Sequence, residues 1–259
     1  MKILVIRNDK LGDFMLAYPS FALAKSNLPD AEIHALVPEY TRAMAECCPC
    51  IDKVISDPGN NSSLKENIHL LKKLKQEKYD AVITLFSTTR IGLLLLLAGI
   101  PYRLAPATKI AQVFYNQKLV QRRSRSEKPE YAYNMDLVFN FLKYLKVSDI
   151  KAPSTPYLSF DKNEIDSLRR KFITLNNIPE KHKLIFIHPG SGGSAVNLSP
   201  DQYSQLANNI TSISGHTIIL SSGPGEQETV YAVAKNITNA PYVIFDSKNG
   251  ILDFAKHIR

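Results

Sequence analysis

The sequence predicts an α/β protein made of two units, each built around a parallel β-sheet. Short aliphatic runs alternate with helical stretches, and the pattern stops near residue 150 and restarts near residue 184. A length of 259 residues fits two domains, and 44% hydrophobic against 22% charged residues supplies a sizeable core and excludes a disordered chain. We expect domains over residues 1–150 and 151–259, with Lys151 to Tyr157 as the linker between them.

The elements of the first half follow in strict alternation. Aliphatic and β-branched runs predict strands at Lys2 to Arg7, Glu32 to Val37, Lys53 to Ser56 and Ala81 to Phe86. Helical periodicity predicts helices at Phe14 to Lys25, Glu39 to Cys47, Ser63 to Glu77 and Thr89 to Leu97, followed by a longer amphipathic helix at Tyr131 to Leu145. Strands joined by helices imply right-handed crossovers and a parallel sheet covered on both faces.

The second half repeats this pattern over a shorter length. We expect strands at Leu184 to His188, Thr217 to Ser221 and Tyr242 to Phe245. Helices are predicted at Pro200 to Ser212, with Ser199 as N-cap, and at Glu226 to Asn236 and Ile251 to His257. A doubly wound nucleotide-binding domain usually has about five or six strands, so we expect the second domain to be incomplete.

Composition excludes several classes of protein. The longest apolar stretch, Ile91 to Ile100, is about half the ~20 residues that cross a bilayer, and we expect Leu93 to Leu97 to form a buried helix rather than an anchor. Met1 and Lys2 lead directly into the first strand and leave no room for a signal peptide, which favours the cytoplasm. The three cysteines lie around Pro49 without a second ligand cluster, so packing is expected rather than a metal site.

Positive charge concentrates in the first half. The net charge of +8 divides into +6 for residues 1–150 and +2 for residues 151–259. The basic stretch from Lys118 to Lys128, which includes Arg122 and Arg123, is either a solvated loop or a surface for an anionic acceptor. Few aromatic residues interleave with it, which argues against nucleic acid.

The loop after the first strand, Arg7 to Asp13, lies where ligands gather in parallel sheets. Its single glycine is not the three-glycine fingerprint of a dinucleotide site. Asp13 could cap the helix that begins at Phe14, or its carboxylate could act as a general base on a substrate hydroxyl.

Two glycine-containing loops follow strands in the second half. The loop from His188 to Ser194 offers backbone amides and hydroxyls to an anion, although flexible turn dihedrals explain its glycines equally well, and His188 alone could be a packing residue. In the loop Ser221 to Glu226, Glu226 could accept hydrogen bonds from a ribose or could simply favour a helix N-terminus.

Five motifs, taken together and in order, resemble glycosyltransferase family 9, the ADP-heptose:lipopolysaccharide heptosyltransferases. They span nearly the whole chain and are Met1 to Arg7 with Leu11-Gly12-Asp13 and Pro19, Pro49-Cys50-Ile51-Asp52-Lys53-Val54-Ile55, Ala98-Gly99-Ile100-Pro101-Tyr102-Arg103, His188-Pro189-Gly190 and Gly223-Pro224-Gly225-Glu226. The resemblance implies a GT-B fold of two Rossmann-like domains, with acceptor sugar on the N-terminal domain and nucleotide sugar on the C-terminal one.

The resemblance also implies a reaction. Asp13 matches the general base that deprotonates an acceptor hydroxyl, so that heptose or a related sugar passes from an ADP-sugar to the lipopolysaccharide inner core with inversion. It implies acceptor binding near Lys10, Gly12, Arg122 and Arg123, and donor binding by His188, Gly190, Ser191, Gly192, Gly193, Ser194 and Glu226. No metal or cofactor is expected, since no Asp-x-Asp pair occurs, and the protein is expected to associate peripherally with the inner membrane.

The sequence departs from the family pattern at two places. The stretch Ser194 to Pro200 lacks the basic residue and Trp that the family often has there, and the later Asp-Ser/Thr-Gly-x-x-His motif does not occur before Arg259. We therefore expect a C-terminally truncated member. The alternatives are a catalytically inactive remnant or binding module, and a nucleoside-diphosphate-sugar enzyme such as an epimerase, which the missing three-glycine fingerprint disfavours.

Overall fold

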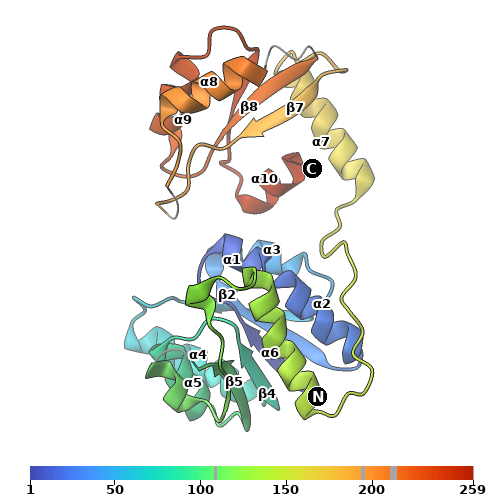
Figure 1. The fold of residues 1–259 in the computed structure, drawn as a ribbon, viewed down its shortest axis with the longest axis vertical. Coiled ribbons are helices and arrows are strands. Elements are labelled where there is room, and N and C mark those ends of the chain that lie inside the picture. The colour runs from blue at the N-terminus through green and yellow to red at the C-terminus, as the bar shows by residue number, and fades with distance from the viewer. Residues whose placement is uncertain (108–109, 194–195, 211–214, 259) are drawn as a thin grey trace. The chain divides into compact units, whose positions relative to one another are not determined.

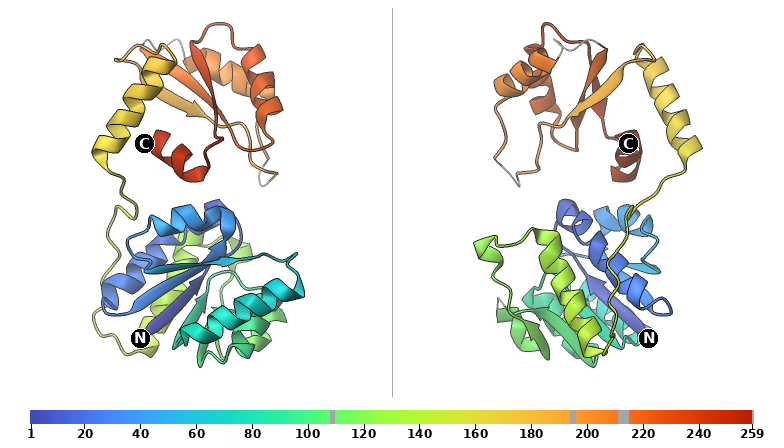
Figure 2. Two further views of the ribbon diagram at one scale, coloured as in Figure 1. Left: turned by 180° about the vertical axis from the view of Figure 1, so that it is seen from behind. Right: turned by 45° about the vertical axis from the view of Figure 1, so that its right-hand side comes forward.

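A computed structural model describes residues 1–107, 110–193, 196–210 and 215–258. The chain divides into two compact units, Met1–Ser159 and Phe160–Arg259 (Figure 1). Each unit is an α/β structure with a parallel sheet between helices, and Figure 2 shows the helices on both sides of each sheet from two further directions. The predicted fold class is confirmed.

The first unit contains a six-stranded sheet in the order β3-β2-β1-β4-β5-β6. All neighbouring strands are parallel, and β1 lies between β2 and β4, with Ile3 opposite Ile33 on one side and opposite Ala81 on the other. The strands are β1 (Lys2–Ile6), β2 (Glu32–Pro38), β3 (Lys53–Asp57), β4 (Ala81–Thr84), β5 (Tyr102–Pro106) and β6 (Gln117–Leu119).

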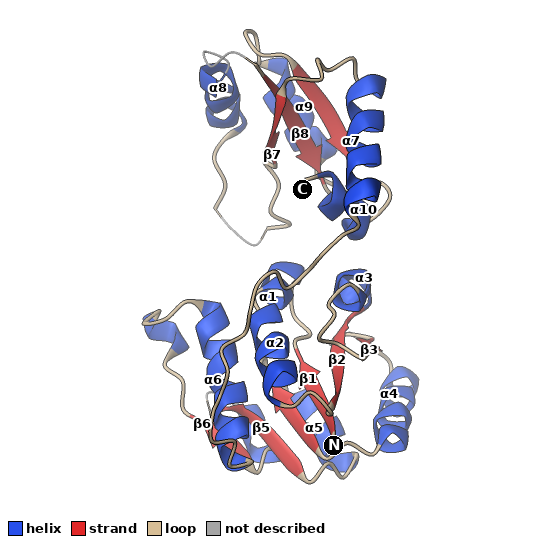
Figure 3. Ribbon diagram, turned by 90° about the vertical axis from the view of Figure 1, so that its right-hand side faces the viewer, coloured by secondary structure: helices blue, strands red, loops and turns tan. Residues whose placement is uncertain are grey.

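Helices cover both faces of this sheet. One hydrophobic cluster joins the sheet to α2 and α6, and a second joins its other face to α4 and α5. Figure 3 shows α2 and α6 on one side of the first sheet and α4 on the other. The helices are α1 (Leu11–Met15), α2 (Tyr18–Asn27), η1 (Glu39–Thr41), α3 (Arg42–Glu46), α4 (Leu64–Glu77), α5 (Thr89–Leu97), η2 (Ile110–Phe114), η3 (Arg123–Arg125) and α6 (Glu130–Tyr144).

The second unit contains a parallel sheet in the order β7-β8-β9 within the described residues. Helices α8 and α9 pack on one hydrophobic cluster, while Phe172 of α7 and Phe254 of α10 pack with Phe245 on the other face. Its elements are α7 (Lys162–Leu175), β7 (Lys183–Ile187), α8 (Pro200–Ile210), β8 (His216–Ser222), α9 (Gln227–Lys235), β9 (Tyr242–Asp246) and α10 (Ile251–His257).

The structure corrects the predicted helix from Phe14 to Lys25. Two helices stand there, α1 and α2, with Pro19 in the first turn of α2. Proline cannot donate the backbone hydrogen bond that a helix interior requires, whereas the first turn leaves that position unbonded. Asp13 therefore lies inside α1, whose N-cap is Lys10, so Asp13 is not the helix cap.

The structure also contains elements that were not predicted, namely β5, β6 and α7. Strands β5 and β6 are short, and α7 follows Asp161, whose side chain accepts a hydrogen bond from the Glu164 amide at 2.9 Å. The expected linker packs with the first unit, where Lys151 and Asn27 exchange backbone and side-chain hydrogen bonds of 2.8 and 2.9 Å. The end of the predicted helix to Ser212 lies outside the described residues.

The leucine run of α5 is only half buried, contrary to expectation. Leu94 and Leu95 face the core, whereas Leu93, Leu96 and Leu97 are 42 to 50% exposed. In the described part of the chain, no helix has both the length and the apolar character needed to cross a membrane.

Candidate functional site

The site on the first unit is a cavity at the carboxyl ends of four strands. The sheet order reverses direction at β1 and β4, and the ends of parallel strands at such a point commonly form a ligand crevice. The cavity has a volume of about 520 Å³. Its lining comes from the segments that follow β1, β4 and β6, from the last residue of β5 and from the start of α6: Arg7, Asp9, Asp13, Leu85, Phe86, Ser87, Pro106, Gln121, Arg123, Ser124 and Glu130.

Arg7 organises this cavity. It directly follows β1, and its side chain is only 3% exposed. Its guanidinium contacts three carboxylates, with Nε 2.7 Å from Asp9 Oδ1, Nη2 3.1 Å from Asp13 Oδ1 and Nη1 2.8 Å from Glu130 Oε1. Nη1 also donates to Asn134 Oδ1 at 3.0 Å. One buried cation thus fixes side chains from the first loop and from α6.

Arg123 extends the network into the cavity from the segment after β6. Its Nη1 lies 2.6 Å from Glu130 Oε1, and its Nε donates to Gln121 Oε1 at 3.0 Å. Gln121 is itself held by a 2.6 Å hydrogen bond to the Tyr133 carbonyl. A planar guanidinium held this way presents its remaining donors in a fixed direction, which suits a carboxylate or phosphate group.

Asp13 is the accessible carboxylate of the group. Its side chain is 36% exposed, against 13% for Asp9. Burial raises the pKa of Asp9, although the adjacent Arg7 opposes the shift. Among the described residues Asp13 contacts Nη2 of Arg7 through Oδ1, which leaves Oδ2 free to accept a proton from a group in the cavity.

The remaining predicted acceptor residues take different positions. Lys10 and Gly12 are exposed beside Asp13 at α1, outside the cavity lining. No atom of the described residues outside the immediate neighbours lies within 4 Å of the place where a Gly12 Cβ would stand. Arg122 is exposed and lines a separate cavity of about 490 Å³. The structure therefore separates Arg122 from Arg123, although the two are neighbours in the chain.

In the second unit, the two glycine-containing loops meet at Glu226. Its Oε1 accepts from the Gly192 amide at 2.9 Å, and its Oε2 accepts from the Gly223 amide at 3.0 Å. His188 contributes Nε2 at 3.2 Å from Oε2, and its Nδ1 lies 3.1 Å from Ser221 Oγ. The loops after β7 and β8 thus direct amides at one anionic group.

This arrangement favours the charged form of Glu226. Burial acts to raise its pKa, but the amides of Gly192 and Gly223, together with His188, lower it below its ordinary value. Glycine at position 190 leaves room for the Glu226 carboxylate, because a Cβ there would overlap it unless that side chain moved. Gly192 and Gly193 have positive φ values of +54° and +71°, which favour glycine.

The rest of the predicted donor loop is less informative. The Ser191 hydroxyl accepts from Asn197 Nδ2 at 3.1 Å, and Ser194 lies outside the described residues. Ser199 accepts from the Gln202 amide at 3.2 Å, which confirms the predicted cap of α8.

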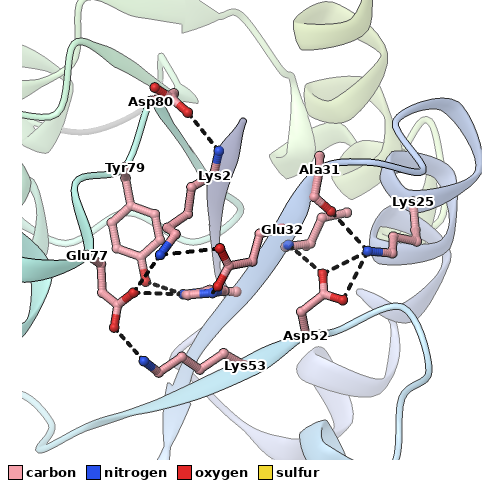
Figure 4. Close-up of polar contacts among 11 residues, drawn as sticks. Lys2, Lys25, Ala31, Glu32, Asp52, Lys53, Glu77, Tyr79 and Asp80 are labelled. Carbon is pink, nitrogen blue, oxygen red and sulfur yellow. Dashed lines mark hydrogen bonds and ion pairs between the residues drawn. The ribbon is translucent and has the colours of Figure 1, made fainter.

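One group within the described residues has metal-ligand side chains close together, namely Glu32, His34 and Glu77, with ligand atoms within 4.8 Å of one another. It lies at the amino-terminal edge of the first sheet, where Figure 4 shows Glu32 and Glu77 beside Lys2. Both His34 ring nitrogens already have partners, with Nδ1 2.7 Å from the Tyr79 hydroxyl and Nε2 2.6 Å from Glu32.

Two lysines also balance the carboxylates of this amino-terminal cluster. Lys2 Nζ lies 3.0 Å from Glu77 and 3.3 Å from Glu32, and Lys53 Nζ lies 2.5 Å from the second oxygen of Glu77. These residues satisfy one another's charges, which favours a structural network over a metal centre.

Sequence reasoning missed the groups that position Asp13. Arg7 was visible as a charged residue at the end of an apolar strand, but Glu130 and Asn134 lie 123 and 127 residues away from it. Their spacing of four on a helix places both on one face, which was the available signal.

Comparison with known proteins identifies the family of this chain. The model of glycosyltransferase family 9 (heptosyltransferase) matches residues 68–248. A Haemophilus influenzae protein, provisionally named a glycosyltransferase, is 45% identical over 255 residues, which are 98% of this chain and 73% of that protein.

Solved structures of the family have the same fold. A family 9 glycosyltransferase from Veillonella parvula aligns with a TM-score of 0.81 at 18% identity. The alignment covers 99% of this chain and 72% of the Veillonella chain. The Escherichia coli ADP-heptose lipopolysaccharide heptosyltransferase II aligns with a TM-score of 0.75 at 19% identity. The alignment covers 100% of this chain and 76% of the Escherichia coli chain. The fold is that of the GT-B heptosyltransferases, and the chain belongs to glycosyltransferase family 9.

Proposed function

We propose that this protein transfers heptose or a related sugar from an ADP-sugar to an acceptor in the lipopolysaccharide inner core, with inversion at the anomeric carbon. The observation that carries the proposal is the partly exposed carboxylate of Asp13 at a cavity on the carboxyl edge of the first sheet, in a chain of family 9. The Escherichia coli relative is named for ADP-heptose and lipopolysaccharide, which supports the same donor and acceptor class here.

In the proposed reaction, Asp13 acts as general base. Its carboxylate takes the proton of an acceptor hydroxyl while the hydroxyl oxygen forms a bond to the anomeric carbon of the donor. The bond from that carbon to the diphosphate breaks, and ADP leaves with the electron pair. Arg7, 3.1 Å from Asp13 Oδ1, holds the carboxylate in place for this step.

The acceptor would bind in the cavity of the first unit. The Arg123 side chain supplies a cation at its lining, and an inner-core acceptor carries anionic groups that suit it. Lys10 and Gly12 lie beside Asp13, where an extended acceptor could reach them, whereas Arg122 would contact only a more distant part of the acceptor.

The donor would bind on the second unit. We assign the diphosphate to the amides of the His188 to Ser194 loop and the ribose hydroxyls to Glu226, whose oxygens already face the amides of Gly192 and Gly223. Backbone dipoles and amides, rather than a metal ion, would offset the charge of the leaving diphosphate. A lipid-linked acceptor would bring the protein to the cytoplasmic face of the inner membrane.

The role of Asp13 can be tested by measuring ADP release with an ADP-sugar and an inner-core acceptor. Asp13→Ala is expected to lower turnover by about a hundredfold to ten-thousandfold, because the proton acceptor is lost. Asp30→Ala, at an exposed position of the same unit, is the matched control and should retain wild-type turnover.

Substantial turnover by Asp13→Ala, with an unchanged thermal transition, would reject Asp13 as the base. Binding of ADP by the wild type without any turnover would support a binding module in place of an enzyme. Absence of ADP binding at millimolar concentration would remove the donor assignment altogether.

A further inference from the structure

An apolar surface covers one flank of the first unit. Nine leucine, isoleucine and valine side chains are exposed in the described part of that unit, and seven of them lie on α4, α5 and η2. These seven are Leu64, Ile68, Leu93, Leu96, Leu97, Ile110 and Val113, and their exposed fractions run from 42 to 81%. Apolar side chains gathered in this way commonly mark a binding surface.

The three elements lie next to one another. Arg90 of α5 donates to Asn67 Oδ1 of α4 at 2.9 Å, and a Cβ on Gly92 would stand 2.9 Å from the Phe114 ring, so α5 also packs closely on η2. Figure 1 shows α4 and α5 side by side. The exposed side chains therefore form one continuous surface, which we call the α4–α5–η2 surface.

Folding of the unit does not require this surface to be apolar. Helix α5 already buries Ile91, Leu94 and Leu95 against the sheet. Leu93, Leu96 and Leu97 follow a spacing of three and four residues on its outer side, where a helix of a globular protein normally carries polar residues. Packing of the core therefore does not explain why the outer side of α5 carries leucines.

The charge around the surface is mainly positive. Helix α4 carries four lysines against two glutamates, and α5 and η2 contain no aspartate or glutamate. Lys65, Lys72 and Lys75 are exposed on α4, and Lys75 continues the spacing of Leu64, Ile68 and Leu71 along that helix.

Four acidic groups near the surface have partners within the unit. Glu66 accepts a hydrogen bond from the Ser63 hydroxyl at 2.7 Å, and Asp57 is buried against Arg90. Glu77 pairs with Lys2 and Lys53, and Asp80 accepts from the Lys2 amide at 2.7 Å. Lys65, Lys72 and Lys75 form no ion pair among the described residues, so the flank presents positive charge beside apolar side chains.

We propose that the α4–α5–η2 surface docks this protein on an anionic lipid leaflet, with the exposed leucine, isoleucine and valine side chains entering the interface and the lysines of α4 contacting headgroups. Apolar insertion and attraction to anionic headgroups act together in peripheral membrane binding, and each alone is weak. The surface itself carries the proposal, which does not depend on the donor, the acceptor or the role of Asp13.

Co-sedimentation with vesicles tests the proposal in the full chain without donor or acceptor. Wild-type protein should bind vesicles of phosphatidylethanolamine and phosphatidylglycerol, and should bind phosphatidylcholine vesicles far more weakly. The triple variant L64S/I110S/V113S changes side chains that are 66 to 81% exposed, so its fold should be preserved, and its binding should fall at least roughly tenfold. Leu175→Ser, which removes a leucine 70% exposed on α7 in the second unit, is the matched control and should bind like wild type.

A second variant tests the charge contribution. In K65E/K72E/K75E, the affinity for phosphatidylglycerol-containing vesicles should fall by roughly fivefold for each lysine replaced. Salt at about 0.5 M should also lower the affinity of the wild-type protein for these vesicles. The proposal is overturned if wild-type protein does not bind the anionic vesicles, or if the triple variant binds them as well as wild type. It is also overturned if wild type sediments as a dimer that the triple variant dissociates, because the surface would then join two copies of the chain.

Discussion

At the scale of single residues, the site depends on a buried cation surrounded by carboxylates. Arg7 is 3% exposed and compensates Asp9, Asp13 and Glu130 together. Removing one member of a buried ionic group leaves the others without compensation, which costs far more than the net contribution of the group. Arg7 is therefore expected to be critical to stability as well as to the orientation of Asp13.

Arg7→Met should lower the free energy of unfolding by about 3 kcal/mol at pH 7. The pKa of Asp9 is already raised by burial, against the opposing effect of Arg7, and losing Arg7 would raise it further. A carboxyl group whose folded-state pKa is raised favours the folded state at low pH and disfavours it as pH rises through that pKa. The decrease in the free energy of unfolding caused by Arg7→Met should therefore become smaller as pH falls from 7 toward 4.

Urea denaturation at several pH values measures this dependence. Arg125→Met is the control, because Arg125 is 61% exposed and should change stability by less than about 0.5 kcal/mol. A loss in Arg7→Met that is independent of pH would contradict the explanation by uncompensated carboxylates.

At the scale of elements, the two edges of the first sheet have different roles. The carboxyl edge forms the cavity, whereas the amino-terminal edge carries the cluster of Lys2, Glu32, His34, Lys53 and Glu77 that joins the first three strands and α4. The hydrogen bond from Lys53 is the largest influence that lowers the pKa of Glu77, with a further contribution from Lys2. The amino-terminal cluster thus stabilises the pairing of the strands and has no role in the proposed reaction.

Glu77→Gln should remove a pH-dependent part of the stability. A carboxylate with a lowered pKa contributes stability above its ordinary value of 4.5, and that contribution disappears as pH falls through the lower folded-state value. We expect a loss of about 1 kcal/mol at pH 7 that vanishes in acid, while transfer activity at pH 7 is retained.

Thermal unfolding followed between pH 7 and pH 3 provides the measurement. Glu127→Gln, at a half-exposed position 3.7 Å from Arg125, is the control and should follow the wild-type curve. An equal loss for Glu77→Gln at both ends of the pH range would show that the ionised form of Glu77 is not what stabilises the edge.

At the scale of the whole molecule, the two units carry different candidate binding sites. The first carries the cavity with Asp13 and the α4–α5–η2 surface, and the second carries the loops that meet at Glu226. If the nucleotide is bound by the second unit, changes at Glu226 and at Asp13 should affect it differently.

Isothermal titration with ADP tests this division. Glu226→Gln should weaken ADP binding by about tenfold to a hundredfold, because a charge-assisted hydrogen bond is worth about 1.5 to 3 kcal/mol. Glu228→Gln, exposed two residues further along the same segment, should bind like wild type, and so should Asp13→Asn. Weakening by Asp13→Asn as strong as that by Glu226→Gln would argue against separate donor and acceptor units.

Much of the fold followed from local patterns. The strands of the first sheet up to Phe86, the helices over Ser63 to Glu77 and Thr89 to Leu97, and the three strands of the second sheet all lie within a few residues of the predicted ranges. Periodicity is a local property, so the sequence reports it directly. Strand β5 was missed because Arg103 and Pro106 interrupt its apolar pattern, and β6 because it has only three residues. Helix α7 was missed although Asp161 and Glu164 form a capping signal.

By itself, the sequence determined two α/β units, family membership and a carboxylate at Asp13 beside the first strand. Only the tertiary structure joined Arg7 to Glu130 and Asn134, put Arg122 and Arg123 in different cavities, and turned three leucines of α5 outward. Periodicity and capping arise among residues a few positions apart, whereas these contacts depend on strand order and on how helices pack across the sheet. That long-range arrangement is what brings distant charges to Asp13 and leaves one flank of the first unit apolar.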